Sequence, residues 1–202
     1  MFYETAQNKH GLPHDPFKAI VAPRPIGWIG SRSGAGVNNL APYSFFNVFN
    51  YRPPLIGFSS QGWKDSVANI AETRMFTWNL ATMTLADAMN ASAAAVDAQV
   101  DEFGLAGVTA VDGQLVAAPR VAESPVSFEC RLTQLIRLET KEGRELDQWL
   151  VIGEAVGIHI AADLIDNGVY QTARARPILR GGGPADYFEV TEAARFEMRR
   201  PD

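Results

Sequence analysis

Five polar residues mark the passage from an apolar segment at residues 55–59 to a segment of helical spacing that begins near residue 65. They carry hydroxyl, ammonium and carboxylate groups: Ser59, Ser60, Lys64, Asp65 and Ser66. The first amides of a helix have no partner inside the helix, and the helix dipole is positive at that end. Because Lys64 adds a full positive charge, the stretch predicts a site for an anion such as the phosphate of a ligand. The alternative is that Lys64 is a solvated lysine beside an ordinary helix cap.

Six consecutive residues upstream combine polar side chains with a proline: Asn39, Leu40, Ala41, Pro42, Tyr43 and Ser44. Pro42 has no amide hydrogen, so it interrupts strand pairing and leaves a neighbouring backbone group free for a ligand. Asn39 and Ser44 can form hydrogen bonds with the polar edge of a flat ring. The alternative is a bulged edge strand whose polar residues face water.

The first half of the chain predicts strands and a helix that would position these residues. Apolar segments at 26–29, 40–48 and 55–59 are separated by turn-forming residues, so we expect three strands. Residues 65–74 have apolar side chains at helical spacing. Residues 75–82 mix aromatic and β-branched side chains, which favours another strand.

The middle of the chain predicts two further helices. Residues 85–96 are rich in alanine and methionine, and Thr84 is placed to cap a helix there. Residues 97–107 predict a shorter helix that glycines terminate. Residues 108–125 are expected to be loop-like, with short extended pieces.

Two long segments near the C-terminal third predict a β-hairpin. Residues 126–139 alternate apolar and polar side chains, which is typical of a strand with one buried face. A charged turn at 140–147 leads to a second strand at 148–161. With few helices and mostly antiparallel neighbours, the chain is expected to be mainly β, a β-barrel with peripheral helices.

Composition limits the class of protein. The 202 residues fit one domain over 1–202, with an irregular lead-in at 1–23 and a polar tail at 188–202. The net charge of −5 argues against nucleic acid or an anionic membrane as the main partner. The single cysteine, Cys130, excludes an internal disulfide and fits a reducing, cytoplasmic setting. Three scattered histidines and one cysteine predict no metal site.

The chain resembles the flavin reductase-like family of FMN-binding split-barrel proteins. The resemblance rests on an ordered set of motifs: RPIGWIGS (24–31), NNLAPYSFFN (38–47), PPLIGFSS (53–60), WKDSVANI (63–70), NLA (79–81), GEAVGIHI (153–160) and RPILRGGGPADY (176–187). It implies a Greek-key antiparallel split barrel, bound FMN and a homodimer. It also implies an oxidoreductase in which NAD(P)H transfers a hydride to the flavin.

The resemblance extends the candidate site to five more residues. Trp28 either borders the flavin or belongs to the core, and Ser31 ends the first strand near the predicted phosphate. Asn79 either reaches the ribityl chain or is an amide satisfied in the core. His159 is a candidate catalytic residue that would orient substrate or move a proton, although a buried structural histidine is equally compatible. Arg180 either closes over the cofactor or belongs to a flexible glycine loop.

Two other functions stay open. The chain could use FMN to reduce another small substrate, or it could be an electron carrier without NAD(P)H activity. A monooxygenase or another protein could accept its electrons. The residues that line the cleft decide between these functions, and the sequence does not identify them.

Overall fold

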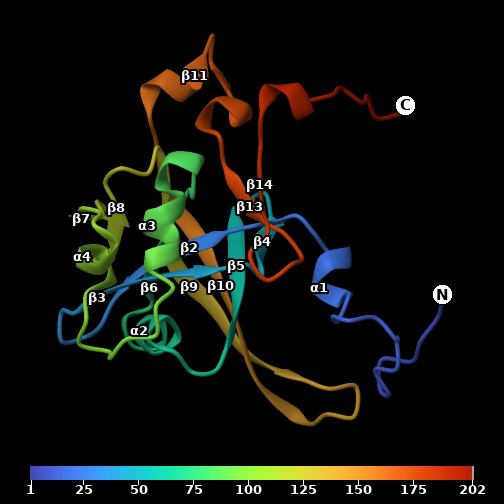
Figure 1. Cartoon of the computed structure of the whole chain (residues 1–202). Coiled ribbons are helices and arrows are strands. Elements are labelled where there is room, and N and C mark those ends of the chain that lie inside the picture. The colour runs from blue at the N-terminus through green and yellow to red at the C-terminus, as the bar shows by residue number, and fades with distance from the viewer. Residues whose placement is uncertain (202) are drawn as a thin grey trace.

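A seven-stranded antiparallel sheet forms the body of the molecule in the computed structural model, which describes residues 1–201 (Figure 1). Its strands are β2 (Gly27–Arg32), β3 (Asn38–Tyr43), β4 (Phe46–Asn50), β5 (Leu55–Gln61), β6 (Met75–Asn79), β9 (Val126–Glu139) and β10 (Glu145–Ile160). They lie side by side in the order β3-β2-β6-β9-β10-β5-β4. The predicted mainly-β class is therefore confirmed.

The two edges of this sheet are connected directly along the chain. β3 lies at one edge and β4 at the other, yet only Ser44 and Phe45 separate them. Two residues cannot cross a flat sheet whose strands are about 4.8 Å apart, so the sheet must curl until its edges approach each other. Within residues 1–201 no backbone pairing joins β3 to β4. The result is a barrel that stays open along one seam.

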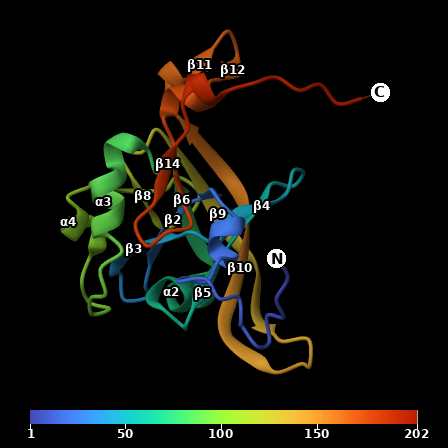
Figure 2. The ribbon, with the colours of Figure 1, turned by 45° about the vertical axis from the view of Figure 1, so that its right-hand side comes forward.

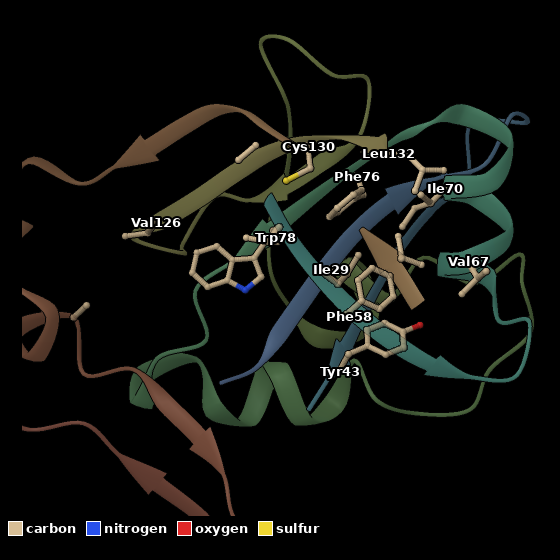
Figure 3. Close-up of a cluster of buried hydrophobic side chains, with 14 of the residues drawn as sticks. Ile29, Tyr43, Phe58, Val67, Ile70, Phe76, Trp78, Val126, Cys130 and Leu132 are labelled. Carbon is tan, nitrogen blue, oxygen red and sulfur yellow. The ribbon is translucent and has the colours of Figure 1, made fainter. Parts of the chain in front are cut away.

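Buried apolar side chains fill the inside of the curled sheet (Figure 3). Ile29, Phe58, Phe76 and Val151 come from four different strands and are at most 1% exposed. Each such side chain stabilises the fold by about 1.5–3 kcal/mol through removal from water. Because β2, β5, β6 and β10 all contribute, the core fixes the strands that carry the candidate site.

Helices are short and lie around the sheet (Figures 1 and 2). They are α1 (Phe17–Ile20), α2 (Asp65–Thr73), α3 (Ala86–Ala91), α4 (Glu102–Ala106) and the 3-10 turns η1 (Met83–Leu85), η2 (Ala162–Leu164), η3 (Thr172–Ala175) and η4 (Glu192–Ala194). α2 buries Val67 and Ile70 in the barrel core. In the described part of the chain, no helix is long and apolar enough to cross a membrane.

Three small sheets complete the fold. In the first, β13 (Ile178–Arg180) lies between β1 (Arg24–Pro25) and β14 (Tyr187–Glu189) and pairs with both. The other two pair β7 (Ala110–Asp112) with β8 (Pro119–Val121) and β11 (Ile165–Asp166) with β12 (Val169–Tyr170). The far end of the β9–β10 hairpin projects beyond the rest of the molecule in both views (Figures 1 and 2).

The helix predicted at 85–96 is shorter in the structure than expected. The chain is helical only in η1 and α3, which ends at Ala91. Ser92 accepts a hydrogen bond from the Trp28 indole and donates one to the Met89 carbonyl, so the chain leaves the helix there. Thr84 lies inside η1 rather than at its start, and its hydroxyl bonds that of Thr82.

Other predicted boundaries also need correction. The segment 40–48 is two strands rather than one, because the chain crosses the seam at Ser44 and Phe45. In 97–107 only α4 is helical, and the Asp101 carboxylate caps it by accepting from the Phe103 amide. The short extended pieces expected in 108–125 are β7 and β8, whereas the second hairpin strand begins at Glu145 rather than at 148.

Candidate functional site

A cavity of about 600 Å³ opens beside the seam of the barrel, where β3, the end of β5 and the start of α2 meet. Several predicted site residues line it: Asn39, Ala41, Pro42, Tyr43, Ser44, Ser59, Lys64, Asp65 and Ser66. The other walls come from Lys18, Phe45, Gln61, residues 92–96, Glu102 and Gln148. The structure thus brings together the two polar stretches that the sequence singled out. We call this space the seam cavity.

The N-terminus of α2 faces the seam cavity with unused donors. Lys64 is the N-cap, and its carbonyl accepts the first bond of the helix from the Ala68 amide. Within residues 1–201 no acceptor is present for the amides of Asp65, Ser66 and Val67. Lys64 is exposed and has no carboxylate partner there. Amides and an ammonium group at a helix start form a receptacle for an anion.

Buried polar side chains connect β2, β3 and α2 behind this receptacle. The Asn39 amide donates to the hydroxyls of Ser66, at 2.9 Å, and Ser31, at 3.2 Å. The Asn69 amide also donates to Ser31, at 3.3 Å. These bonds fix the start of α2 against the edge strand β3. Asn39 and Ser31 therefore position the receptacle from behind.

Tyr43 places a buried hydroxyl without a partner in the wall of the seam cavity. Its ring packs on Phe58 at a centroid distance of 4.4 Å, and residues 1–201 offer its hydroxyl no hydrogen bond. Burial raises the pKa of Tyr43, and the hydroxyls of Ser66 and Ser60 lie close by without hydrogen-bond geometry. A buried donor without a partner is costly unless a ligand or water satisfies it. This hydroxyl therefore points to a ligand in the cavity.

Replacing Tyr43 with phenylalanine is expected to separate binding from folding. The change removes an unpaired hydroxyl, so the free energy of unfolding of the ligand-free protein should not fall. Ligand affinity should fall by about 0.5–1.5 kcal/mol if the hydroxyl donates to the ligand. Chemical denaturation would measure the stability, and a fluorescence titration with FMN, the ligand that the family resemblance implies, would measure the affinity. A stability loss with unchanged affinity would assign the hydroxyl to the fold.

Two carboxyl groups also border the seam cavity, Asp65 and Glu102. Burial raises the pKa of Glu102, although its carboxylate accepts a hydrogen bond from the Leu40 amide at 3.1 Å. A raised pKa reduces the negative charge that this group places beside an incoming anion. The bond to Leu40 also ties α4 to β3, which shapes one wall.

Five predicted site residues lie behind the cavity wall rather than on it: Trp28, Ser31, Leu40, Ser60 and Asn79. Asn79 is fully buried; its amide donates to Trp28, and its oxygen accepts from Val121 and Ser127. Trp28 is also fully buried and bonds Ser92. These contacts fit the alternative interpretation, in which Trp28 and Asn79 are core residues. Arg180 lines another cavity, between the N-terminal lead-in and the loop after β13.

His159 faces a second cavity of about 590 Å³, which we call the histidine cavity. Its Nε2 lies 2.5 Å from Oε1 of Glu129, whose side chain is 1% exposed. Burial opposes ionisation of Glu129. Amide hydrogen bonds from Gln114, Leu115 and Val116 and the bond to His159 nevertheless lower its pKa to about 2. Glu129 is therefore an ionised anchor that fixes the imidazole ring at the cavity wall.

Glu129 is a site residue that the sequence reasoning missed. The alternation in 126–139 placed it on the solvent face, but Ser127 and Glu129 are both buried. The segment that links β7 to β8 folds over this face of β9 and supplies the three amides. An acidic residue between apolar neighbours, on the strand expected to pair with the one that carries His159, was the only available signal.

Comparison with known proteins identifies the family. Residues 21–179 match the model of the Flavin reductase like domain. An uncharacterized protein of Aquifex aeolicus is 34% identical over 170 residues, 81% of this chain and 83% of the relative. One of Halalkalibacterium halodurans is 35% identical over 186 residues, 90% of this chain and 87% of the relative.

Solved structures agree with this assignment. Nitrilotriacetate monooxygenase component B from Bacillus cereus superimposes with a TM-score of 0.89 at 28% identity, over 98% of each chain. The 2-nitrobenzoate 2-nitroreductase NbaA of Pseudomonas fluorescens has a TM-score of 0.85 at 26% identity, over 100% of this chain and 96% of its own. A split-barrel protein described as a flavin reductase, from Shewanella frigidimarina, shares the fold at 19% identity, with a TM-score of 0.80 over 98% of this chain and 100% of its own. The family match and the seam of the curled sheet lead to one conclusion: the chain is a split-barrel protein of the flavin reductase-like family.

Proposed function

We propose that this protein is a flavin-dependent oxidoreductase that binds FMN in the seam cavity and accepts a hydride from NAD(P)H. The observation that carries the proposal is the receptacle at the junction of β5 and α2. Within residues 1–201 it combines helix amides, a lysine and the Tyr43 hydroxyl that all lack a partner, on one cavity wall.

The residues present fit FMN. Its phosphate needs donors and positive charge, which the start of α2 and Lys64 supply. Its flat ring needs a slot, and the seam cavity offers small side chains at Ala41, Pro42 and residues 93–95. The volume of about 600 Å³ lies within the range usual for ligand sites. When bound, the flavin supplies the hydride chemistry.

The protein's own residues would bind FMN, orient it and shield it from water. The start of α2 holds the phosphate, and the Asn39 and Ser31 bonds keep that helix end in register with β3. Ser59 accepts a hydrogen bond from Gln148 at 2.6 Å, so both side chains are held at the cavity edge. Positioning of this kind is the main contribution that a protein makes to a cofactor's reaction.

His159 is the candidate residue for proton movement. Its Nε2 is held by Glu129, so the orientation of the ring is fixed while the histidine cavity stays open beside it. A histidine near neutral pH can orient a substrate or exchange a proton with it. Glu129 would act through His159 and is a positioning residue.

Replacing His159 with alanine should impair turnover more than flavin binding. General acid–base groups contribute roughly 10²–10⁴-fold to a rate, whereas His159 does not line the seam cavity. Steady-state kinetics and an FMN titration on the same preparation measure both effects. Equal losses of turnover and flavin affinity would assign His159 to the fold instead.

A steady-state assay tests the proposed function. Purified protein is mixed with NADH or NADPH, with and without added FMN, and oxidation of the pyridine nucleotide is followed by absorbance. Flavin-dependent oxidation is the expected result. A protein that binds FMN but is inert to both nucleotides would be an electron carrier, and a protein that ignores FMN would contradict the whole assignment.

Reduction of a small organic substrate is a second candidate. The structurally similar NbaA is described as a 2-nitrobenzoate 2-nitroreductase, and in this protein such an acceptor would have to reach the flavin in the seam cavity. In this case the assay with pyridine nucleotide and FMN would proceed only slowly until a nitroaromatic acceptor was added. Consumption of the acceptor would be followed by chromatography.

The predicted homodimer belongs to the same proposal. Large apolar side chains on and after the edge strand β4 are exposed: Val48 is 60%, Phe49 55% and Tyr51 78% exposed. Exposed apolar groups of this kind on a sheet edge support association with a second copy. Light scattering should give twice the chain mass of 22.0 kDa. A mass of a single chain would contradict the dimer.

A further inference from the structure

Arg120 places a guanidinium without an acceptor in the wall of the histidine cavity. Its neighbours in β8, Pro119 and Val121, are buried, so Arg120 points away from them to the other side of the strand. Its Nε is buried and has no partner within residues 1–201, where no ion pair includes it either. A buried donor without an acceptor is costly unless a ligand or water satisfies it.

The carboxylate in the same wall, that of Glu129, does not supply the missing acceptor. Its Oε1 accepts from the Gln114 amide at 2.8 Å and contacts His159, and its Oε2 accepts from the amides of Leu115 and Val116, at 2.6 and 3.0 Å. These four contacts occupy both oxygens of a side chain that is 1% exposed. The positive charge of the guanidinium therefore stays uncompensated.

His159 presents a second polar atom to this cavity. Its Nε2 faces the ionised Glu129 and so carries the ring hydrogen, and no partner for its Nδ1 is present among residues 1–201. Nδ1 can accept a hydrogen bond from a ligand when the ring is neutral and donate one when it is protonated. The cavity thus combines an unused cationic fork with an unused ring nitrogen.

Apolar surface borders these polar groups. Leu115 is 54% exposed and lies over Gly157, where an added Cβ would come within 3.3 Å of Leu115 Cδ1. Ala122, Pro125 and Ala161 also line the cavity. A pocket that joins apolar walls to a few polar groups suits a ligand with an apolar body and one polar head.

Charge and shape indicate which anionic head fits. A guanidinium offers parallel N–H groups that match the two oxygens of a carboxylate. The negative charge of Glu129 beside Arg120 and His159 opposes a dianion such as phosphate more strongly than a monoanion. A single carboxylate is therefore the better match.

We propose that the histidine cavity binds the carboxylate of a small organic acid through Arg120, with Nδ1 of His159 as a second contact and the apolar body against Leu115. The inference does not rest on the proposed function, because no described residue lines both the histidine cavity and the seam cavity. Arg120 would determine specificity for the acid, and Glu129 would keep His159 in place.

A titration of the full chain followed by NMR tests this inference. Benzoate, which joins a carboxylate to a compact apolar ring, is added to isotopically labelled protein. The Nε–H signal of Arg120 is identified by its absence in Arg120→Lys. Benzamide is the neutral comparison molecule, and inorganic phosphate is the rival anion. Calorimetry then gives the Kd for wild type, Arg120→Gln, Arg120→Lys and the control Arg144→Gln, which removes an exposed arginine in the β9–β10 turn.

Benzoate should shift the Arg120 Nε–H signal, and its Kd should rise roughly tenfold in Arg120→Gln, the scale of one lost charge-assisted hydrogen bond. Arg120→Lys should keep part of the affinity, because it retains the charge without the planar fork. Arg144→Gln should match wild type. Urea unfolding should show no loss of stability in Arg120→Gln, since the guanidinium has no protein partner among residues 1–201.

An Nε–H signal that benzoate leaves in place would overturn the inference, as would an unchanged Kd in Arg120→Gln. Benzamide binding as tightly as benzoate, or phosphate binding more tightly, would overturn it too. FMN affinity should be the same in all four proteins, because Arg120 does not line the seam cavity. Failure of wild type to bind FMN would refute the proposed function and leave the acid site standing.

Discussion

Replacing Lys64 with alanine is expected to weaken FMN binding by about 1.5–3 kcal/mol, or roughly 10- to 150-fold in Kd. Lys64 is the only lysine at the start of α2, and it has no carboxylate partner within the described chain. Its loss removes a charge-assisted bond to the phosphate. Fluorescence titration at fixed ionic strength measures the effect.

Folding should be unaffected by the same substitution. The exposed Lys64 side chain makes no hydrogen bond in residues 1–201, so the free energy of unfolding should change by less than about 0.5 kcal/mol. Lys141→Ala, in the exposed β9–β10 turn, is the matched control and should bind FMN as wild type does. If the Lys64 variant also bound FMN normally, Lys64 would be the solvated surface residue of the alternative interpretation.

Replacing Glu129 with glutamine should lower the free energy of unfolding at pH 7 by about 3 kcal/mol. Three amides and His159 hold the carboxylate, and its pKa falls from 4.5 to about 2 despite burial. A glutamine cannot accept all four bonds, and its amide group would face amide donors. Urea unfolding at pH 7 measures the difference between the two proteins.

The direction of the Glu129 pKa shift determines how the stability of wild type and of Glu129→Gln should change with pH. A group whose pKa is lower in the folded state stabilises the fold above its ordinary pKa, and that stabilisation is lost as pH falls through the folded value. For Glu129 the window runs from 4.5 down to about 2. Wild type should therefore lose stability in this range more steeply than Glu129→Gln. Glu142→Gln, at an exposed position, serves as the control and should follow wild type. Parallel curves for all three proteins would contradict the anchoring role.

The fold could be predicted to a large extent because strand patterns are local. The hairpin of β9 and β10 follows from alternation and a charged turn, and the strand after α2 from its aromatic residues. The length of the helix at 85–96 could not be predicted correctly. The hydrogen bond between Trp28 and Ser92 that accompanies its end joins residues far apart in the sequence. Alanine content favours helix but does not reveal a tertiary contact.

The candidate site was predictable where its residues are consecutive. Residues 39–44 and 59–66 meet because the chain crosses the seam directly from β3 to β4, and because β5 is followed closely by α2. Glu129 was missed because another segment folds over what looked like the outer face of its strand. The hydrogen bonds of the Asn79 side chain with Trp28, Val121 and Ser127 become visible only in the folded structure.

A crystal structure of the protein soaked with FMN tests the central claim most directly, because it locates the phosphate group itself. The account predicts phosphate oxygens within hydrogen-bond distance of the Asp65 and Ser66 amides and of Lys64, with the Tyr43 hydroxyl facing the ligand. A flavin bound elsewhere, with the start of α2 covered by protein or water alone, would contradict it.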